Sequence, residues 1–274
     1  MSNSTPSPRQ FEQTLDIQVP RDAVWRALSH GEEIARWFAP EVQVDAQVGG
    51  VMGWKWRDHF DWQQTIDAIE PGKHLRTRYD AWRGQGDSEH PLFIDFHLEG
   101  EGGTTTLRIV HSGFTTDSSF DSEFDGISGG WPIELESLRL YLENHHGRDR
   151  QLTWTRATLD VDATTAWQKL SAADAFGCAV ANGTPKGEAF AFSSGDGDRF
   201  EGNVLKADGK EFVGIVKNHG DGFLRLWVGD HEGKAMIWLW LATYGDAPVP
   251  GLKQRWDAMV QRLFANEIAE SNAS

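Results

Sequence analysis

Apolar and polar side chains alternate along residues 11–19, where the patterned part of the chain begins. A period of two is typical of a strand with one buried face. Two short helices are predicted next, over residues 20–28 and 32–38. Pro20 suits a first helical position, and Pro40 disfavours helical geometry in the residue before it. The chain is therefore predicted to open with a strand followed by two short helices.

Strand-like runs, separated by turns rich in glycine and aspartate, make up the next part of the chain. Sequential strands joined by short turns predict an antiparallel meander. The polar residues 115–130 are expected to form a loop, and a long helix is predicted from about Trp131 to the His146-Gly147 stop. The strands are expected near residues 51–56, 60–70, 74–82, 92–99 and 104–112, and the apolar stripe of the helix consists of Trp131, Leu135, Leu138 and Leu142.

The same order of elements returns in the second half of the chain. Residues 158–162, followed by a helix-like stretch at 166–170, echo residues 14–18 and 24–28. A repeat of about 140 residues is too long for a solenoid unit and indicates a duplicated domain. The second set of strands is expected near residues 188–193, 199–206, 210–217, 223–228 and 234–244, before a final helix from about Pro250.

These elements predict an α+β fold in two tandem copies. In each copy a curved antiparallel sheet is wrapped around a long C-terminal helix, and because sheet and helix diverge, a cavity is expected between them. The predicted organisation is a disordered leader over residues 1–10, a first domain over 11–147 and a second over 151–270.

Three ordered motifs in the first copy carry a family resemblance. They are residues 29–40 (SHGEEIARWFAP), residues 107–114 (LRIVHSGF) and Gly130-Trp131. With them the first copy resembles the START-like superfamily (SRPBCC, the helix-grip or Bet v 1-like fold), and within it the family named for the activator of the 90-kDa heat-shock protein's ATPase. The second copy keeps the order of elements without these motifs, so it is expected to be a degenerate copy.

Charge and cysteine content narrow the function classes. The chain has 26 Lys and Arg against 41 Asp and Glu, a formal net charge of −15. Such a charge repels nucleic acid and anionic lipid headgroups, and residues 235–242, the longest apolar stretch near the C-terminus, are too few to span a bilayer. The single cysteine, Cys178, excludes an intramolecular disulfide. We expect a cytoplasmic protein that binds neither nucleic acid nor membranes.

Aromatic side chains on the strands of the first copy are the main candidates for a ligand site. They fall on faces expected to point at the long helix, and large apolar side chains with a few polar groups are typical of small-molecule pockets. Core packing is the alternative for each one singly. The candidate ligand-binding residues are Trp37, Phe38, Met52, Trp54, Trp56, Trp62, Tyr79, Phe96, His111, Phe114 and Trp131.

His111 is the one candidate for catalysis. It shares a strand face with Leu107 and Ile109, so it should point toward the long helix. There it could act as a polar anchor, as a general acid or base, or as a structural histidine that closes the sheet end. Asp95 and His97 fall on the opposite face from their apolar neighbours and are expected to point away from the core.

No metal site and no cofactor are predicted. His145 and His146 adjoin each other at a helix end, where cations interact favourably with the helix dipole. Phosphate-binding and nucleophile-elbow patterns do not occur in the sequence, and Cys178 has no nearby basic residue to activate it.

Three functions remain open. The first is binding of a hydrophobic or aromatic small molecule in the cavity between sheet and C-terminal helix. The resemblance implies the other two, a cyclase- or hydrolase-type enzyme that would use His111 and a regulator of a chaperone or another protein. The tandem copies could also form a pseudo-dimer within one chain. Binding and catalysis both require a hollow large enough for a guest molecule.

Overall fold

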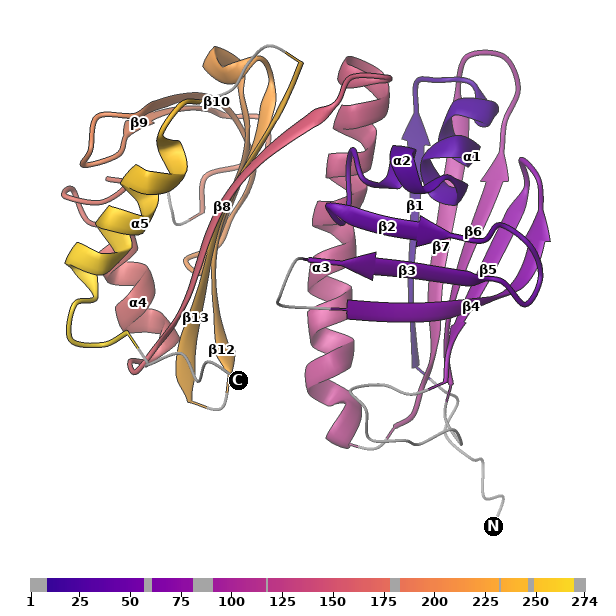
Figure 1. Ribbon diagram of the computed structural model, residues 1–274, viewed down its shortest axis with the longest axis horizontal. Helices are drawn as coiled ribbons and strands as arrows, with labels where there is room; N and C mark the ends of the chain where they lie inside the picture. The colour runs from indigo at the N-terminus through magenta and orange to yellow at the C-terminus, as the bar shows by residue number, and fades with distance from the viewer. Residues whose placement is uncertain are drawn as a thin grey trace. The chain divides into compact units, whose positions relative to one another are not determined.

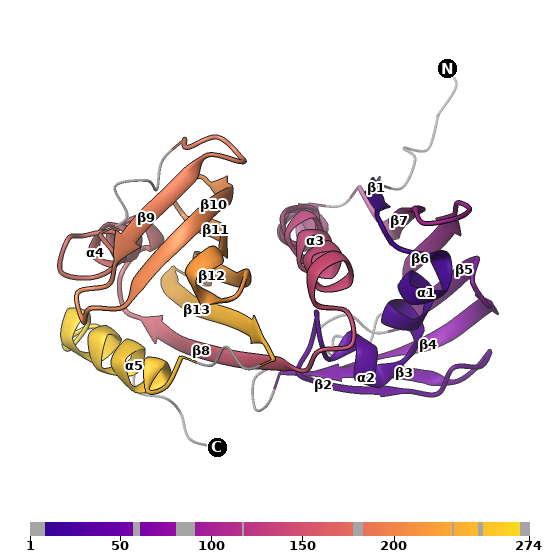
Figure 2. The ribbon, with the colours of Figure 1, turned by 90° about the horizontal axis from the view of Figure 1, so that it is seen from above.

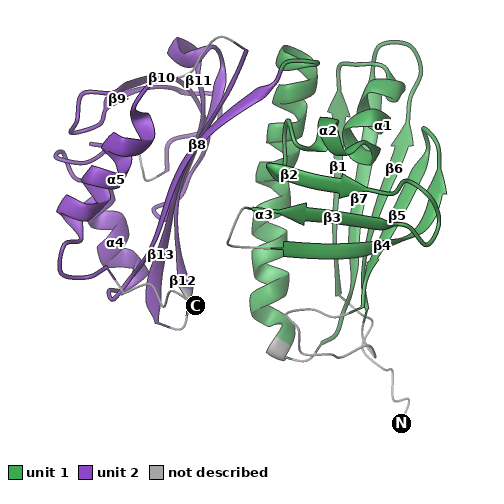
Figure 3. Ribbon diagram, viewed as in Figure 1, with its two compact units in different colours: residues 1–148 green, residues 149–274 purple. Residues whose placement is uncertain are grey.

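The structure is a computed structural model that separates the chain into two compact units, residues 1–148 and 149–274 (Figure 3). Cys178 lies outside the described residues. Among the described residues, no helix is long and apolar enough to cross a membrane. The described residues are 9–56, 61–80, 91–116, 118–177, 183–231, 233–245 and 249–268.

A seven-stranded antiparallel sheet forms the body of the first unit (Figure 1). Its order is β1-β7-β6-β5-β4-β3-β2, so the first strand pairs with the last and the others form the predicted meander. The strands are β1 (Arg9–Ile17), β2 (Glu41–Val44), β3 (Val51–Lys55), β4 (Asp61–Glu70), β5 (His74–Tyr79), β6 (Leu92–Glu99) and β7 (Thr105–Phe114).

Two details of this sheet differ from the prediction. Arg9 and Gln10 belong to β1, so the expected leader over residues 1–10 extends too far. The short edge strand β2 was not predicted, because Glu41–Val44 is too brief to stand out as a pattern and forms only by pairing with β3.

Three helices cover one side of the first sheet. α1 (Arg21–Ser29) packs on β6, and α2 (Gly31–Ile34) packs on β2. The strands curve around α3 (Asp121–Leu140), which lies on their concave side (Figure 2). This arrangement is the predicted sheet wrapped around a helix, with α3 continuing into a π-helical turn over Tyr141–His145.

The prediction of a loop over residues 115–130 was wrong, because α3 begins at Asp121 and not near Trp131. Three glycines and Pro132 make this part of the sequence a poor helix by propensity. Tertiary contacts offset that cost. The ring of Phe124 packs 5.3 Å from that of Phe114, and the Arg9 guanidinium lies over the Phe124 ring and pairs with Asp121 at 2.5 Å.

The second unit repeats the plan with a six-stranded sheet in the order β8-β13-β12-β11-β10-β9. Two helices, α4 (Ala163–Leu170) and α5 (Leu252–Leu263), lie on one side of it (Figure 2). Its strands are β8 (Arg150–Leu159), β9 (Ala189–Ser193), β10 (Arg199–Ala207), β11 (Glu211–Val216), β12 (Gly222–His231) and β13 (Lys234–Tyr244). The protein is thus an α+β fold with two tandem helix-grip units.

Candidate functional site

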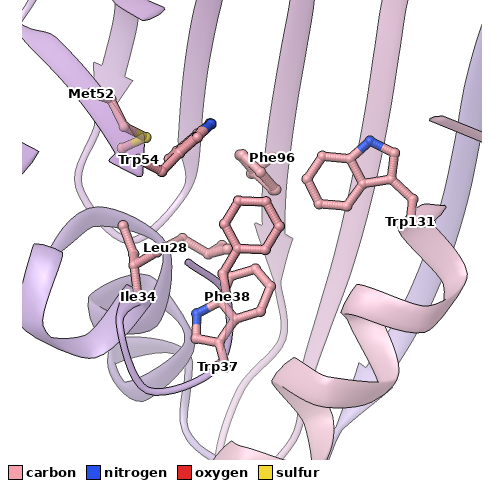
Figure 4. Close-up of a pocket in the computed structure, with 8 residues that line it drawn as sticks. All are labelled: Leu28, Ile34, Trp37, Phe38, Met52, Trp54, Phe96 and Trp131. Atoms are coloured by element: carbon pink, nitrogen blue, oxygen red, sulfur yellow. The ribbon is translucent and has the colours of Figure 1, made fainter. Parts of the chain in front are cut away.

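A small apolar pocket lies in the first unit between the sheet, the α1–α2 corner and α3 (Figure 4). Its cavity volume is about 10 Å³, which is close to the space that one water molecule needs. Within the described residues, converging aromatic side chains leave this pocket much smaller than the open hollow that the sequence predicted. The lining residues are Leu28, Ile34, Trp37, Phe38, Met52, Trp54, Phe96 and Trp131.

Six of the predicted binding residues are in this lining, and Leu28 and Ile34 join them. The sequence places those two in short apolar stripes of the first two helices, with no sign that the stripes face a pocket. Phe38 and Trp131 are the two lining residues that are partly exposed, whereas the other six are buried. These two side chains therefore form the boundary between the pocket and solvent.

Hydrogen bonds hold the Trp37-Phe38 turn in place. The Trp37 indole donates to the carbonyl of Ala27 at 2.8 Å, and the Ser137 hydroxyl of α3 donates to the carbonyl of Trp37 at 2.9 Å. At the base of the turn, the Tyr141 hydroxyl donates to the buried carboxylate of Glu33 at 2.5 Å. The turn is thereby fixed to α1 and α3, and this fixes where Phe38 enters the pocket.

Phe38 lies at the centre of the aromatic cluster. Its ring meets Trp54 and Trp56 edge to face, with centroids 5.5 Å and 5.0 Å apart. The Trp131 ring lies 6.3 Å away and is nearly parallel to it, at an interplanar angle of 5°. Because the Phe38 ring packs against both the strands and α3, it fills most of the space between them and closes the pocket.

The remaining aromatic candidates form a surrounding layer. Trp56 packs against Trp62 at 5.8 Å, and the Trp54 indole donates to the hydroxyl of Tyr79 at 3.3 Å. Burial raises the pKa of the Tyr79 hydroxyl well above its usual value. Phe114 is fully buried and packs against the His111 ring at 5.1 Å. These residues support the pocket from behind.

His111 faces α3 from the inner face of β7. Its Nδ1 accepts a hydrogen bond from the Trp131 indole at 3.0 Å. An indole N–H can only donate, so Nδ1 carries no proton and the proton of the neutral ring is on Nε2. Burial lowers the pKa of His111 from 6.5 to about 3. The imidazole is therefore neutral at physiological pH.

Two further polar side chains on the inner face were not predicted. Gln64 on β4 is 2% exposed and lies opposite Met52, and Thr77 on β5 is fully buried between the inward positions of Leu75 and Tyr79. A polar residue at an apolar position of an alternating strand is the sequence signal that could have found them. The structure brings them to the same side of the sheet as His111.

A second polar cluster lies on the opposite face of the sheet. Ligand-type atoms of His74, Asp95 and His97 all lie within 4.8 Å of one another, and Asp95 is buried beneath its neighbours. The Asp95 carboxylate accepts from His74 Nε2 at 2.8 Å and pairs with Arg76 at 3.3 Å. The guanidinium already neutralises the carboxylate and would repel a cation, so an ion-pair network accounts for this cluster.

The core of the second unit is filled by aromatic rings. Trp256 on α5 is fully buried, with its ring 6.0 Å from Phe176 and 6.4 Å from Phe200. Phe190 and Phe212 pack edge to face in the same core at 5.0 Å. Within the described residues, these rings fill the space between α5 and the sheet.

Comparisons with known proteins match the first unit and the tandem plan. Residues 18–143 match the family model described as "Activator of Hsp90 ATPase homolog 1-like protein". A crystal structure of MLL2253 from Mesorhizobium loti is 22% identical, with a TM-score of 0.45, covering 50% of this chain and 99% of that one. No curated protein matches the chain.

The solved structures that match include some that extend over both units. DynU16, a putative protein in the dynemicin biosynthetic locus, is 17% identical with a TM-score of 0.44, covering 93% of this chain and 96% of that one. The di-domain ARO/CYC protein BexL from the BE-7585A biosynthetic pathway is 12% identical with a TM-score of 0.44, covering 92% and 93%.

Proposed function

Since the first unit belongs to the Activator of Hsp90 ATPase homolog 1-like family of the START-like superfamily, we propose that it binds a hydrophobic, aromatic small molecule between its sheet and α3. The observation that carries this proposal is the pocket itself, which only apolar and aromatic side chains line. Such linings are typical of small-molecule sites. The second unit, with its filled core, serves as a scaffold.

Binding requires Phe38 and Trp131 to move, because the free volume holds no more than about one water molecule. These are the partly exposed lining residues, and neither side chain belongs to a strand of the sheet. Trp131 follows Gly129 and Gly130 in α3 and precedes Pro132, which cannot donate the helical hydrogen bond to residue 128. The turn of α3 that contains Gly129, Gly130 and Pro132 is therefore the weakest part of the wall.

His111 serves this function as a hydrogen-bonding group and not as a general base. A general acid or base works best with a pKa near the operating pH. Burial holds the pKa of His111 at about 3, so at neutral pH the ring neither gains nor loses a proton readily. This property suits recognition of a neutral ligand.

Replacing Phe38 by alanine should strengthen binding of the neutral fluorescent probe 1-aminoanthracene by about tenfold, because the displacement of the ring no longer opposes binding. The measurement is a titration of probe fluorescence with the full-length protein. Phe93→Ala is the matched control, since Phe93 lies on the outer face of β6 beneath the Arg76 guanidinium at 4.3 Å. The proposal is contradicted if wild type and both variants bind the probe with equal affinity, or if none of the three binds it.

Replacing Gly129 and Gly130 together by alanine should slow association of the same probe. A Cβ at either position meets nothing within 4 Å, and each alanine stabilises a helix by about 1 kcal/mol. Opening that unwinds this part of α3 then becomes rarer by about tenfold or more. Stopped-flow fluorescence measures the rate, and Gly103→Ala in the β6–β7 turn is the control. An unchanged association rate would show that α3 does not open.

A further inference from the structure

Three buried polar side chains on the strands of the first unit have no hydrogen-bond partner for at least one polar atom within the described part of the chain. The atoms are Nε2 and Oε1 of Gln64, Oγ1 of Thr77 and Nε2 of His111. Their residues are 2%, 0% and 3% exposed. Leaving one such group unsatisfied costs about 1–3 kcal/mol, so each calls for an explanation.

The strand register gathers these groups on the inner face of the sheet. Thr77 pairs with Ile94, and Ile94 pairs with His111, so the threonine and the histidine occupy one row across three strands. Gln64 lies two residues before Ile66, the partner of Thr77, and is thus its diagonal neighbour. With strands about 4.8 Å apart, the row from Thr77 to His111 spans about 10 Å. We call Gln64, Thr77 and His111 the polar row.

The polar row adjoins the apolar pocket. Gln64 lies opposite Met52, and His111 bonds Trp131, and both of these partners are pocket-lining residues. The row offers a defined set of hydrogen bonds. His111 Nε2–H is a donor, because Nδ1 already accepts from the indole, while Gln64 and Thr77 can each donate and accept.

Another buried threonine on the same face provides a comparison, because its hydroxyl has a hydrogen-bond partner within the protein. Thr105 is fully buried on β7, and its hydroxyl donates to the carbonyl of Val19 at 2.8 Å. Its polar group therefore serves the fold. Thr77 is equally buried but has no such bond to any of the described residues, which separates the polar row from ordinary buried polar residues.

We propose that the polar row recognises oxygen substituents of the bound molecule, so that the ligand is a flat aromatic compound with hydroxyl or carbonyl groups and not a plain hydrocarbon. This inference rests on the proposed function of the pocket. His111 Nε2–H donates to an oxygen at one edge of the ligand, and Thr77 and Gln64 bond an oxygen toward the opposite edge. Charged ligands are disfavoured, since only apolar and aromatic side chains line the pocket beside the polar row and burying an unpaired charge there is costly.

The first test compares two probes of the same shape, naphthalene and 2,6-dihydroxynaphthalene. Wild-type protein should bind the diol about tenfold more tightly, which corresponds to one or two net hydrogen bonds. The nearly isosteric variants Gln64→Leu and Thr77→Val should lose this preference while binding naphthalene at least as well as wild type. Titrations that follow quenching of tryptophan fluorescence give the four affinity ratios, including that of Thr105→Val.

The second test measures stability without ligand. Removing an unpartnered buried polar group should raise the melting temperature of the first unit, so Gln64→Leu and Thr77→Val are each expected to raise it by about 2–4 °C. The matched control Thr105→Val should lower it, because this change breaks a made bond and leaves the Val19 carbonyl unsatisfied. Opposite signs for the same substitution at Thr77 and Thr105 would identify the polar row as groups kept for a ligand.

The outcomes separate this inference from the proposed function. Equal affinity for both probes, with no effect of the variants, overturns the polar row and leaves binding in the pocket intact. Absence of binding by either probe overturns the proposed function together with this inference. A fall in melting temperature for both Gln64→Leu and Thr77→Val would assign these groups a structural role, for example through bound water, and would also overturn it.

Discussion

Replacement of Trp256 by alanine is expected to lower the free energy of unfolding of the second unit by about 3–5 kcal/mol, the usual cost of deleting a fully buried aromatic side chain. The indole lies between α5 and the sheet against Phe176 and Phe200. The surrounding rings can collapse only partly into the space it leaves. Hydrogen exchange of the backbone amides of β10 to β12 in the presence of denaturant measures the loss.

Trp256→Phe is the matched control for this prediction. Phenylalanine keeps most of the ring volume, and it removes an indole N–H that has no partner among the described residues. Its cost should therefore be much smaller than that of alanine. Similar losses for the two variants would show that the indole is held by something other than packing, and a small loss for alanine would contradict the tightly filled core.

Lowering the pH from about 7.5 to about 5 is expected to destabilise the first unit through His111 by about 2 kcal/mol. The unfolded chain takes up a proton on this ring below its ordinary pKa of 6.5, whereas burial holds the folded pKa at about 3. The unfolded state thus binds more protons across this window, so the stabilisation present above pH 6.5 is lost as the pH falls toward 3.

His111→Gln provides the comparison, because glutamine does not titrate and its side-chain oxygen can still accept from the Trp131 indole. Denaturant unfolding of wild type and variant at both pH values measures the difference. The free energy of unfolding of the variant should fall less, by about 2 kcal/mol, than that of wild type over this range. Parallel pH dependences would mean that His111 is not held neutral by burial. All other titratable groups are common to the two proteins, so their contributions cancel in the comparison.

The candidate site illustrates how far residue types alone can lead. Met52, Trp54 and Phe96 were expected at the pocket because alternation within a strand fixes which face a side chain occupies. Leu28 and Ile34 were not expected there, since a helical stripe does not state what it packs against. Gln64 was not predicted, because the inward face of its strand was identified from aromatic residues and the glutamine is a single polar residue among them.

Helix α3 shows a second limit. Its later turns carry the apolar spacing that predicted a helix from Trp131 onward. Its earlier turns contain Gly126, Gly129 and Gly130 and look like a loop, yet they are helical because Phe124 and Asp121 are held by Phe114 and Arg9. Contacts between residues more than a hundred positions apart, such as Arg9 and Asp121, cannot be predicted from a local sequence pattern.

The sequence by itself determined the tandem plan, the α+β class and the faces of most strands, because these follow from periodic alternation and turn residues within short stretches. The tertiary structure alone decided whether the space between sheet and helix is open. Its volume depends on how far apart the backbones of the sheet and α3 lie. It also depends on how much of that space is filled by side chains from the Trp37-Phe38 turn, the sheet and α3. Both quantities depend on how segments that are far apart in the sequence pack together, so no local sequence pattern predicts them.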